Sequence, residues 1–165
     1  MAIASLQVGK VYIYSRGPDS NWPSLPNFTL NVPVRSQQNS FARRGVSLSK
    51  SFALVGLPSD GKAFIFTKAA GIWSADPVQN FTQQPRMFGF CVGITDLYAV
   101  VSAYTSNTAY LFRSLSNGRW LETPVQILNE PGIPARFLGH SCALSDYEVI
   151  LGSYQVGASA QPSFL

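Results

Sequence analysis

The sequence predicts an all-β fold, and three observations carry this prediction. Short runs rich in β-branched and aromatic residues recur along the 165-residue chain, separated by turns rich in Gly, Pro, Asn, Asp and Ser. No segment of about 10–15 residues shows a sustained helical period near 3.6 residues. The 13 glycines and 11 prolines are dispersed along the chain and disfavour long helices.

Two sequence patterns repeat along the chain. The first is a strand-like run followed by a turn and a tryptophan, and its copies end at Trp22, Trp73 and Trp120, which are 51 and 47 residues apart. The runs before these tryptophans are Val11-Tyr12-Ile13-Tyr14, Ala63-Phe64-Ile65-Phe66 and Ala109-Tyr110-Leu111-Phe112. The second pattern centres on Leu48, Ile94 and Leu144, which are 46 and 50 residues apart. Both patterns therefore recur with a period near 48 residues.

Four short strands in about 48 residues make a unit of the size of one propeller blade. A β-sandwich would explain the alternating pattern but not the long-period repeat. We therefore expect residues 1–165 to be a single β-propeller segment of four-stranded blades, about three per chain. The expected units are strands three and four of a split blade at 8–30, complete blades at 41–82 and 87–128, strands one and two of a split blade at 137–154, and a tail at 155–165.

The second pattern also carries a family resemblance. Phe88-Gly89-Phe90-Cys91-Val92-Gly93-Ile94, followed by Tyr98-Ala99-Val100-Val101, resembles the opening of an FG-GAP repeat, and residues 137–144 with 148–152 resemble another. The segments 9–14 and 61–66 resemble its second half, so the resemblance spans roughly residues 8–154. It implies integrin-like blades around a central channel.

The family's calcium-binding members carry a D-x-D-x-D-G-type loop, which this sequence lacks. The corresponding turns hold Lys50, Asp96 and Asp146, one charged side chain each. Because a calcium ion takes about six or more oxygen ligands, we expect no calcium site, and we expect no other metal or cofactor.

The order of the patterns predicts an incomplete ring. About three blades are fewer than the usual four to eight, and each split blade leaves an edge with unpaired backbone groups. We expect two copies of the chain to share a six-bladed ring, in which residues 137–154 of one copy complete residues 10–30 of the other. A three-chain ring of nine blades and a fragment of a larger propeller are the alternatives.

Repeated loop residues are the candidate ligand site. Arg86 and Arg136 precede equivalent first strands, and Tyr104 and Tyr154 follow equivalent second strands. In a propeller these loops lie on one face, where Arg beside an aromatic ring suits a glycan, an acidic group or a protein. The competing interpretation is that Arg neutralises loop carbonyls and Tyr packs over the rim. The first repeat differs, with Ser40 and Pro58 at these places and Arg35 and Arg43 nearby.

The three tryptophans are a second candidate for ligand contact. Trp22, Trp73 and Trp120 could stack on sugar rings, but their fixed place at the start of the outermost strand favours packing within and between blades.

These features favour a non-enzymatic, lectin-like propeller that binds glycans or another repeated ligand. A structural or protein–protein interaction scaffold is the alternative. An enzyme is less favoured, because the eight acidic residues are scattered and no catalytic motif occurs. His140 and Ser141 are adjacent, so on a strand their side chains point to opposite faces.

Composition restricts the remaining classes. A net charge of +4 with scattered basic residues predicts no nucleic-acid binding, and no apolar stretch reaches the ~20 residues of a membrane-spanning helix. Cys91 and Cys142 lack metal-ligand spacing and are expected to be small buried hydrophobes in strands. The first residues lack a signal-peptide pattern, which favours a cytoplasmic location. Glycosylation of the Asn27 and Asn80 sequons is therefore not expected. A mature extracellular fragment is the alternative.

Overall fold

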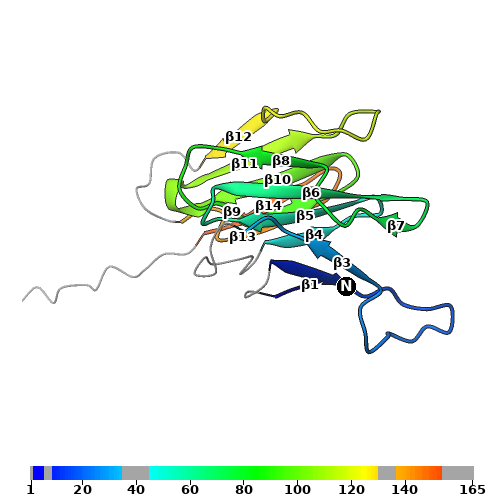
Figure 1. Ribbon diagram of the computed structural model, residues 1–165. Helices are drawn as coiled ribbons and strands as arrows, with labels where there is room; N and C mark the ends of the chain where they lie inside the picture. The colour runs from blue at the N-terminus through cyan, green and yellow to red at the C-terminus, as the bar shows by residue number, and fades with distance from the viewer. Residues whose placement is uncertain (1, 6–8, 35–44, 130–136, 154–165) are drawn as a thin grey trace, which may run out of the picture.

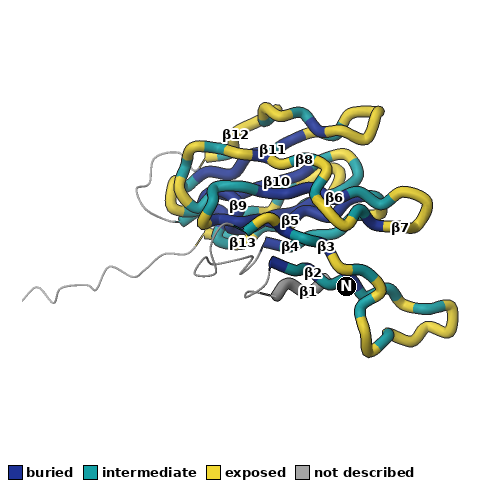
Figure 2. The backbone as a smooth tube through the Cα atoms, in the orientation of Figure 1, coloured by how far each residue is buried: buried dark blue, intermediate teal, exposed yellow. Residues whose placement is uncertain are grey.

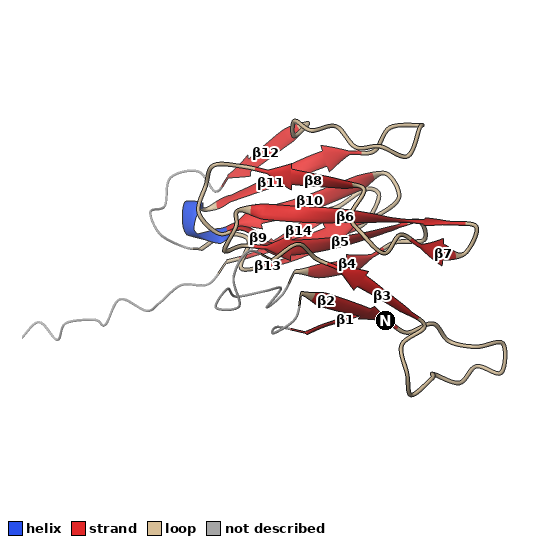
Figure 3. Ribbon diagram, viewed as in Figure 1, coloured by secondary structure: helices blue, strands red, loops and turns tan. Residues whose placement is uncertain are grey.

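The structure is a computed structural model that describes residues 2–5, 9–34, 45–129 and 137–153 (Figure 1). In this part of the chain all strand pairings are antiparallel, and the strands form four sheets. The helical content there is one 3-10 turn, η1 (Tyr104–Ser106) (Figure 3). The prediction of an all-β fold is confirmed. No helix in the described ranges is long and apolar enough to cross a membrane.

The four sheets follow one another along the chain. The first sheet has the order β1 (Ala2–Ser5), β2 (Lys10–Ile13), β3 (Phe28–Asn31). The second has the order β4 (Val46–Leu48), β5 (Phe52–Leu57), β6 (Lys62–Ala69), β7 (Ile72–Trp73), and β8 (Gln79–Thr82) also pairs with β6. The third contains β9 (Phe88–Ile94), β10 (Tyr98–Ala103), β11 (Thr108–Arg113) and β12 (Gln126–Asn129) in sequential order, and the fourth contains β13 (Ser141–Leu144) and β14 (Val149–Gly152).

One hydrogen-bonding arrangement recurs in the first three sheets. The strand that precedes each tryptophan pairs with an outermost strand, in the registers Ile13–Phe28, Ile65–Gln79 and Leu111–Gln126. The residue before each outermost strand donates its N–H to the carbonyl of the same partner, in the pairs Asn27–Ile13 (2.9 Å), Val78–Ile65 (2.8 Å) and Val125–Leu111 (2.8 Å). These registers define structurally equivalent positions from sheet to sheet.

The start of the chain adds a strand that the sequence did not predict. Residues 8–30 were expected to provide strands three and four of a split blade, and β1 pairs with the other edge of β2, with Ala2 opposite Ile13 and Ser5 opposite Lys10. Gly9 has a φ of +61° directly before β2, a conformation that glycine adopts at little cost and that suits a chain reversal. The edge of β2 that was predicted to be open is therefore covered by a local strand.

The sheets stack face to face, and the core lies between them (Figures 1 and 2). The second sheet is buried on both faces. Leu54 and Ile65 face the third sheet, while Val55 and Phe66 face the first. Because successive strand residues point to opposite faces, burial of all six residues of β5 requires a neighbouring sheet on each side.

Glycine lets the second and third sheets approach closely. A Cβ atom on Gly56 would collide with the carbonyl oxygen of Gly89, which itself has a φ of +95°. At the next interface Ser102 takes the place of Gly56. Its hydroxyl donates to the Gly139 carbonyl at 2.7 Å and accepts from the Cys91 N–H at 3.0 Å. The third and fourth sheets are thus joined by a buried hydroxyl.

The two cysteines form a disulfide bond. Cys91 in β9 and Cys142 in β13 are 51 residues apart and join the third sheet to the fourth, with their Cα atoms 6.0 Å apart. Both lie in strands, as expected, but the prediction that they act as small apolar side chains is wrong. Stacking of the fourth sheet on the third brings β13 against β9, which the sequence spacing did not reveal.

Candidate binding face at one end of the sheets

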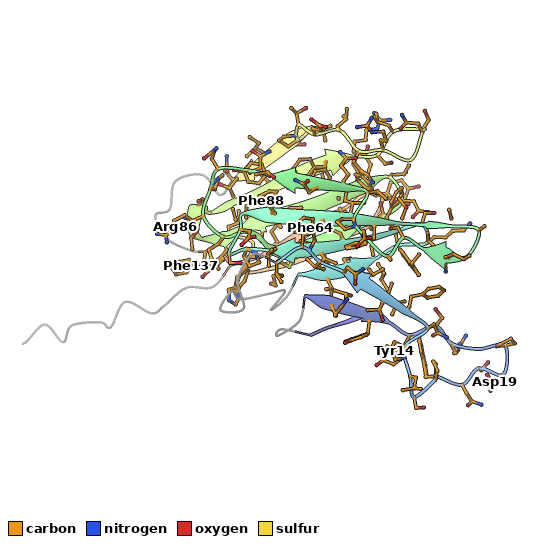
Figure 4. The ribbon with its side chains drawn as sticks, viewed as in Figure 1. Tyr14, Asp19, Phe64, Arg86, Phe88 and Phe137 are labelled. Carbon is orange, nitrogen blue, oxygen red and sulfur yellow. A yellow bond between two sulfur atoms is a disulfide. The ribbon has the colours of Figure 1, made fainter. Side chains whose placement is uncertain are left out.

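Arg86 lies at the end of the sheets where the β5–β6, β8–β9 and β10–β11 connections gather. Its side chain is exposed, and Figure 4 shows it at the same end of the molecule as Phe137, far from Tyr14 and Asp19. The hydroxyl of Thr105, in η1, donates to the backbone carbonyl of Arg86 at 2.9 Å. This bond fixes the loop of Arg86 against the loop that carries Tyr104.

A recess of about 430 Å³ opens beside Arg86. The β5–β6 turn, residues 58–61, forms one wall, and the end of β8 with the β8–β9 connection, residues 82–87, forms the other. The residues that line this recess include Arg86 and Asp60. Polar walls of this kind suit a hydrated, hydrogen-bonding ligand.

An aromatic cluster lies beyond Arg86 on the same end. The Tyr104 ring centre is 4.2 Å from that of Phe90, 5.6 Å from that of Phe137 and 5.9 Å from that of His140. The His140 ring is also 5.3 Å from Phe90. Tyr104 is half-buried, with these three rings as its aromatic neighbours.

The chain enters β9 and the segment before β13 through the same backbone conformation. Met87 has a φ of +64° and Phe137 a φ of +52°, and the two residues are equivalent and 50 positions apart. Positive φ costs a non-glycine residue on the order of 1–3 kcal/mol and is common at binding sites. The strain at Met87 directs the chain from the exposed Arg86 into the buried strand.

Half of the predicted ligand residues can be placed. Arg86 and Tyr104 lie on one end of the third sheet, in loops that are hydrogen-bonded to each other. Arg136 and Tyr154 lie outside the described residues, as do Ser40, Arg35 and Arg43. Pro58 lines the recess beside Arg86. Sequence reasoning missed Phe90, Phe137 and His140 as neighbours of Tyr104, because ring contacts between loops and strands leave no periodic signal.

The three tryptophans differ sharply in exposure. Trp73 is 8% exposed and Trp120 is 2% exposed, each packed against the sheet that precedes its own. Trp22 is 57% exposed, because no sheet formed by the described part of the chain lies in front of the first one. The packing interpretation therefore describes Trp73 and Trp120, whereas Trp22 presents its ring to the surface.

The opposite end of the sheets carries a carboxylate that links two turns. Asp96, in the β9–β10 turn, accepts hydrogen bonds from the Ser49 hydroxyl (2.6 Å), the Ser51 N–H (3.0 Å) and the Ser51 hydroxyl (3.2 Å) of the β4–β5 turn. Partial burial raises the pKa of Asp96, but these bonds and the nearby Lys50 charge outweigh it, and the pKa is lowered overall. Asp96 thus fastens the third sheet to the second.

Among the described residues, no three or more His, Cys, Asp or Glu side chains gather as they would to hold a metal ion. The comparisons with known proteins add no assignment: no protein family matches the chain, and no curated protein matches it.

Proposed function

We propose that this chain is a non-enzymatic, lectin-like binding module of the β-propeller type, and that it recognises acidic glycans at the end that carries Arg86. The four sheets act as consecutive blades. This arrangement accounts for the recurrent registers, the face-to-face stacking and the regular alternation of the loops between two ends. The resemblance to FG-GAP repeats supports the same reading.

The juxtaposition of an exposed guanidinium group, a polar recess and a half-exposed aromatic cluster carries the ligand proposal. A guanidinium group binds a carboxylate or sulfate through two parallel hydrogen bonds, and an aromatic ring packs against the apolar face of a sugar. The net charge of +4 favours an anionic ligand further.

Arg86→Ala and Arg86→Lys test this proposal in a glycan array that includes sialylated, sulfated and uronic-acid glycans. We expect Arg86→Ala to abolish binding and Arg86→Lys to retain a small part of it, because lysine keeps the charge but loses the planar fork. Arg119→Ala is the matched control, since Arg119 is also an exposed arginine but lies in the β11–β12 connection at the other end. Binding that survives in Arg86→Ala, or that is lost equally in Arg119→Ala, refutes the assignment.

A scaffold role is the second candidate, and a separate observation favours it. Large apolar side chains lie exposed in the loop that joins β2 to β3 and on the last sheet, with Trp22 at 57% and Ile150 at 67%. Exposed apolar side chains of this size are suited to protein contact rather than to a polar ligand.

A further inference from the structure

The packing site of Trp120 on the second sheet shows how one sheet binds the tryptophan of the next. The Trp120 ring meets Phe52 edge to face, with ring centres 5.2 Å apart. The side-chain amide of Gln79 donates to the Trp120 carbonyl at 2.8 Å and accepts from the Trp120 N–H at 3.0 Å. One aromatic ring and one glutamine thus hold both the side chain and the backbone of the incoming tryptophan.

The third sheet carries the same two groups on its outer face, around an empty recess. Tyr98 is the equivalent of Phe52, since each begins the second strand of its sheet, and Gln126 is the equivalent of Gln79 by register. Tyr98 and Gln126 line a recess of about 370 Å³ together with Leu111 and the β13–β14 turn. We call this recess the tryptophan socket.

Trp22 has the local structure of a tryptophan that fits such a socket. In the loop before Trp120, the Leu115 N–H donates to the Arg119 carbonyl at 2.7 Å. In the loop before Trp22, the Gly17 N–H donates to the Asn21 carbonyl at 3.0 Å, which is the same bond two sheets earlier. Trp22 is therefore presented as Trp120 is, but it is 57% exposed where Trp120 is 2% exposed.

The other face of the last sheet gives an independent sign of a missing neighbour. Ile150 in β14 occupies the position of Leu54 and Val100, which are both 0% exposed because the following sheet covers them. Ile150 is 67% exposed. Among the described residues, no sheet lies in front of the first one and none lies behind the fourth.

We infer that a second copy of this chain docks its first sheet beside β14, with its Trp22 in the tryptophan socket. The first sheet of the same copy cannot reach the socket, because it packs on the second sheet, which separates it from the third. Tyr98 would meet the Trp22 ring, and the Gln126 amide would bond the Trp22 backbone. This inference rests on the proposed blade arrangement.

Opposite charges and free backbone groups would add to the contact between Trp22 and the tryptophan socket. The equivalent registers place Arg16 of the docking copy beside the β13–β14 turn, which carries Asp146 and Glu148. They also place β2 of the docking copy along β14, whose partner in the described sheet is β13 alone. Because β1 occupies that edge of β2, docking displaces β1 and exchanges one strand pairing for another.

The test measures molecular mass against protein concentration, by light scattering and sedimentation, for the full chain and for Trp22→Ala and Gln126→Ala. We expect a defined assembly of the full chain. Trp22→Ala should weaken it about 30-fold or more, because a buried interface tryptophan contributes about 2 kcal/mol or more. Ile72→Ala is the control: Ile72 is 66% exposed on the second sheet and lies outside the socket, so its loss should leave the mass unchanged.

Two further readouts separate docking from misfolding. Trp22 is exposed in the single copy, so Trp22→Ala should leave the melting temperature of the dilute, dissociated chain unchanged. Assembly of the full chain should shift tryptophan fluorescence to shorter wavelength and reduce acrylamide quenching, and Trp22→Ala should lose both changes. Ile3→Pro, which removes a backbone donor from β1, should strengthen assembly by freeing the edge of β2.

A full chain that stays monomeric at all concentrations refutes the inference, as does an assembly that Trp22→Ala and Gln126→Ala leave intact. Weaker assembly of Ile3→Pro refutes the strand exchange. The glycan array separates this inference from the proposed function. Arg86→Ala should lose glycan binding but keep the molecular mass of the assembly. If Trp22→Ala dissociates the assembly while Arg86→Ala still binds glycans, the glycan site alone is refuted.

Discussion

Asp96→Asn tests the link between the second and third sheets. The carboxylate accepts three hydrogen bonds from Ser49 and Ser51, and the asparagine amide retains one oxygen to accept them. Bonds to a charged group contribute about 1.5–3 kcal/mol each when buried, and this turn is only partly buried. We therefore expect a loss of about 2 kcal/mol in the free energy of unfolding, which lowers the melting temperature by about 4–8 °C.

The chain offers a matched control for this substitution. Asp146 occupies the same turn position 50 residues later and is exposed. In the dilute, dissociated chain, Asp146→Asn removes the same charge from the same kind of turn and should change the free energy of unfolding by less than about 0.5 kcal/mol. Chemical denaturation at neutral pH measures both variants, and equal losses in the two would refute the assigned role of Asp96.

The pH dependence gives a second check of the same bond set. Folding lowers the pKa of Asp96, because the bonds to Ser49 and Ser51 and the charge of Lys50 outweigh partial burial. The stabilisation is therefore complete above the unfolded-chain pKa of about 3.9 and is lost as the pH falls through the lower folded-state value. The difference in the free energy of unfolding between the native chain and Asp96→Asn should therefore shrink over this acidic range. A difference that keeps its size there would refute the reasoning.

Three further predictions concern the sheet interfaces. Ser102→Ala leaves the Cys91 N–H without its buried acceptor and the Gly139 carbonyl without its donor. It should lower the free energy of unfolding by about 2–4 kcal/mol, measured by urea denaturation. Reduction of the Cys91–Cys142 disulfide, which closes a separation of 51 residues, should lower the free energy of unfolding by about 2–4 kcal/mol, measured with and without reductant. Gly56→Ala forces a Cβ atom against the Gly89 carbonyl and should cost about 3 kcal/mol or more in thermal unfolding.

Controls for these predictions come from exposed positions. Ser106→Ala in η1 should leave the free energy of unfolding almost unchanged. If Ser102→Ala costs no more than Ser106→Ala, the hydrogen bonds of the Ser102 hydroxyl do not stabilise the interface between the third and fourth sheets. Gly71 also has a positive φ, +82°, but open space surrounds its Cβ position. Gly71→Ala should therefore cost only the conformational penalty, about 1–2 kcal/mol, and a comparable cost in Gly56→Ala would show that the sheets can separate there.

The strands that repeat were the predictable part of the fold. The run 63–66 lies within β6 and the run 109–112 within β11, because a short, continuous apolar run between turns is typical of a strand whose two faces are both covered. β1 was missed, because Ala2–Ser5 has no counterpart in the repeat.

The contacts between neighbouring sheets could not be predicted from the sequence. Trp22, Trp73 and Trp120 look alike in the repeat, yet their exposure depends on whether a sheet lies in front of each. Likewise, 51 residues between the two cysteines gave no hint of a bond, because only the stacking of one sheet on the next brings Cys91 and Cys142 together. The candidate face was predicted as far as Arg86 and Tyr104, and the aromatic cluster that holds Tyr104 was not.

The disulfide between Cys91 and Cys142 has a consequence for how the molecule opens. A stack of sheets opens from its ends, since each end sheet is held through one face only, and the fourth sheet has two strands in the described part of the chain. The cross-link keeps that sheet within reach of the third after its hydrogen bonds break. In native-state hydrogen exchange, reduction should therefore accelerate the amides of β13 and β14 far more than those of β5.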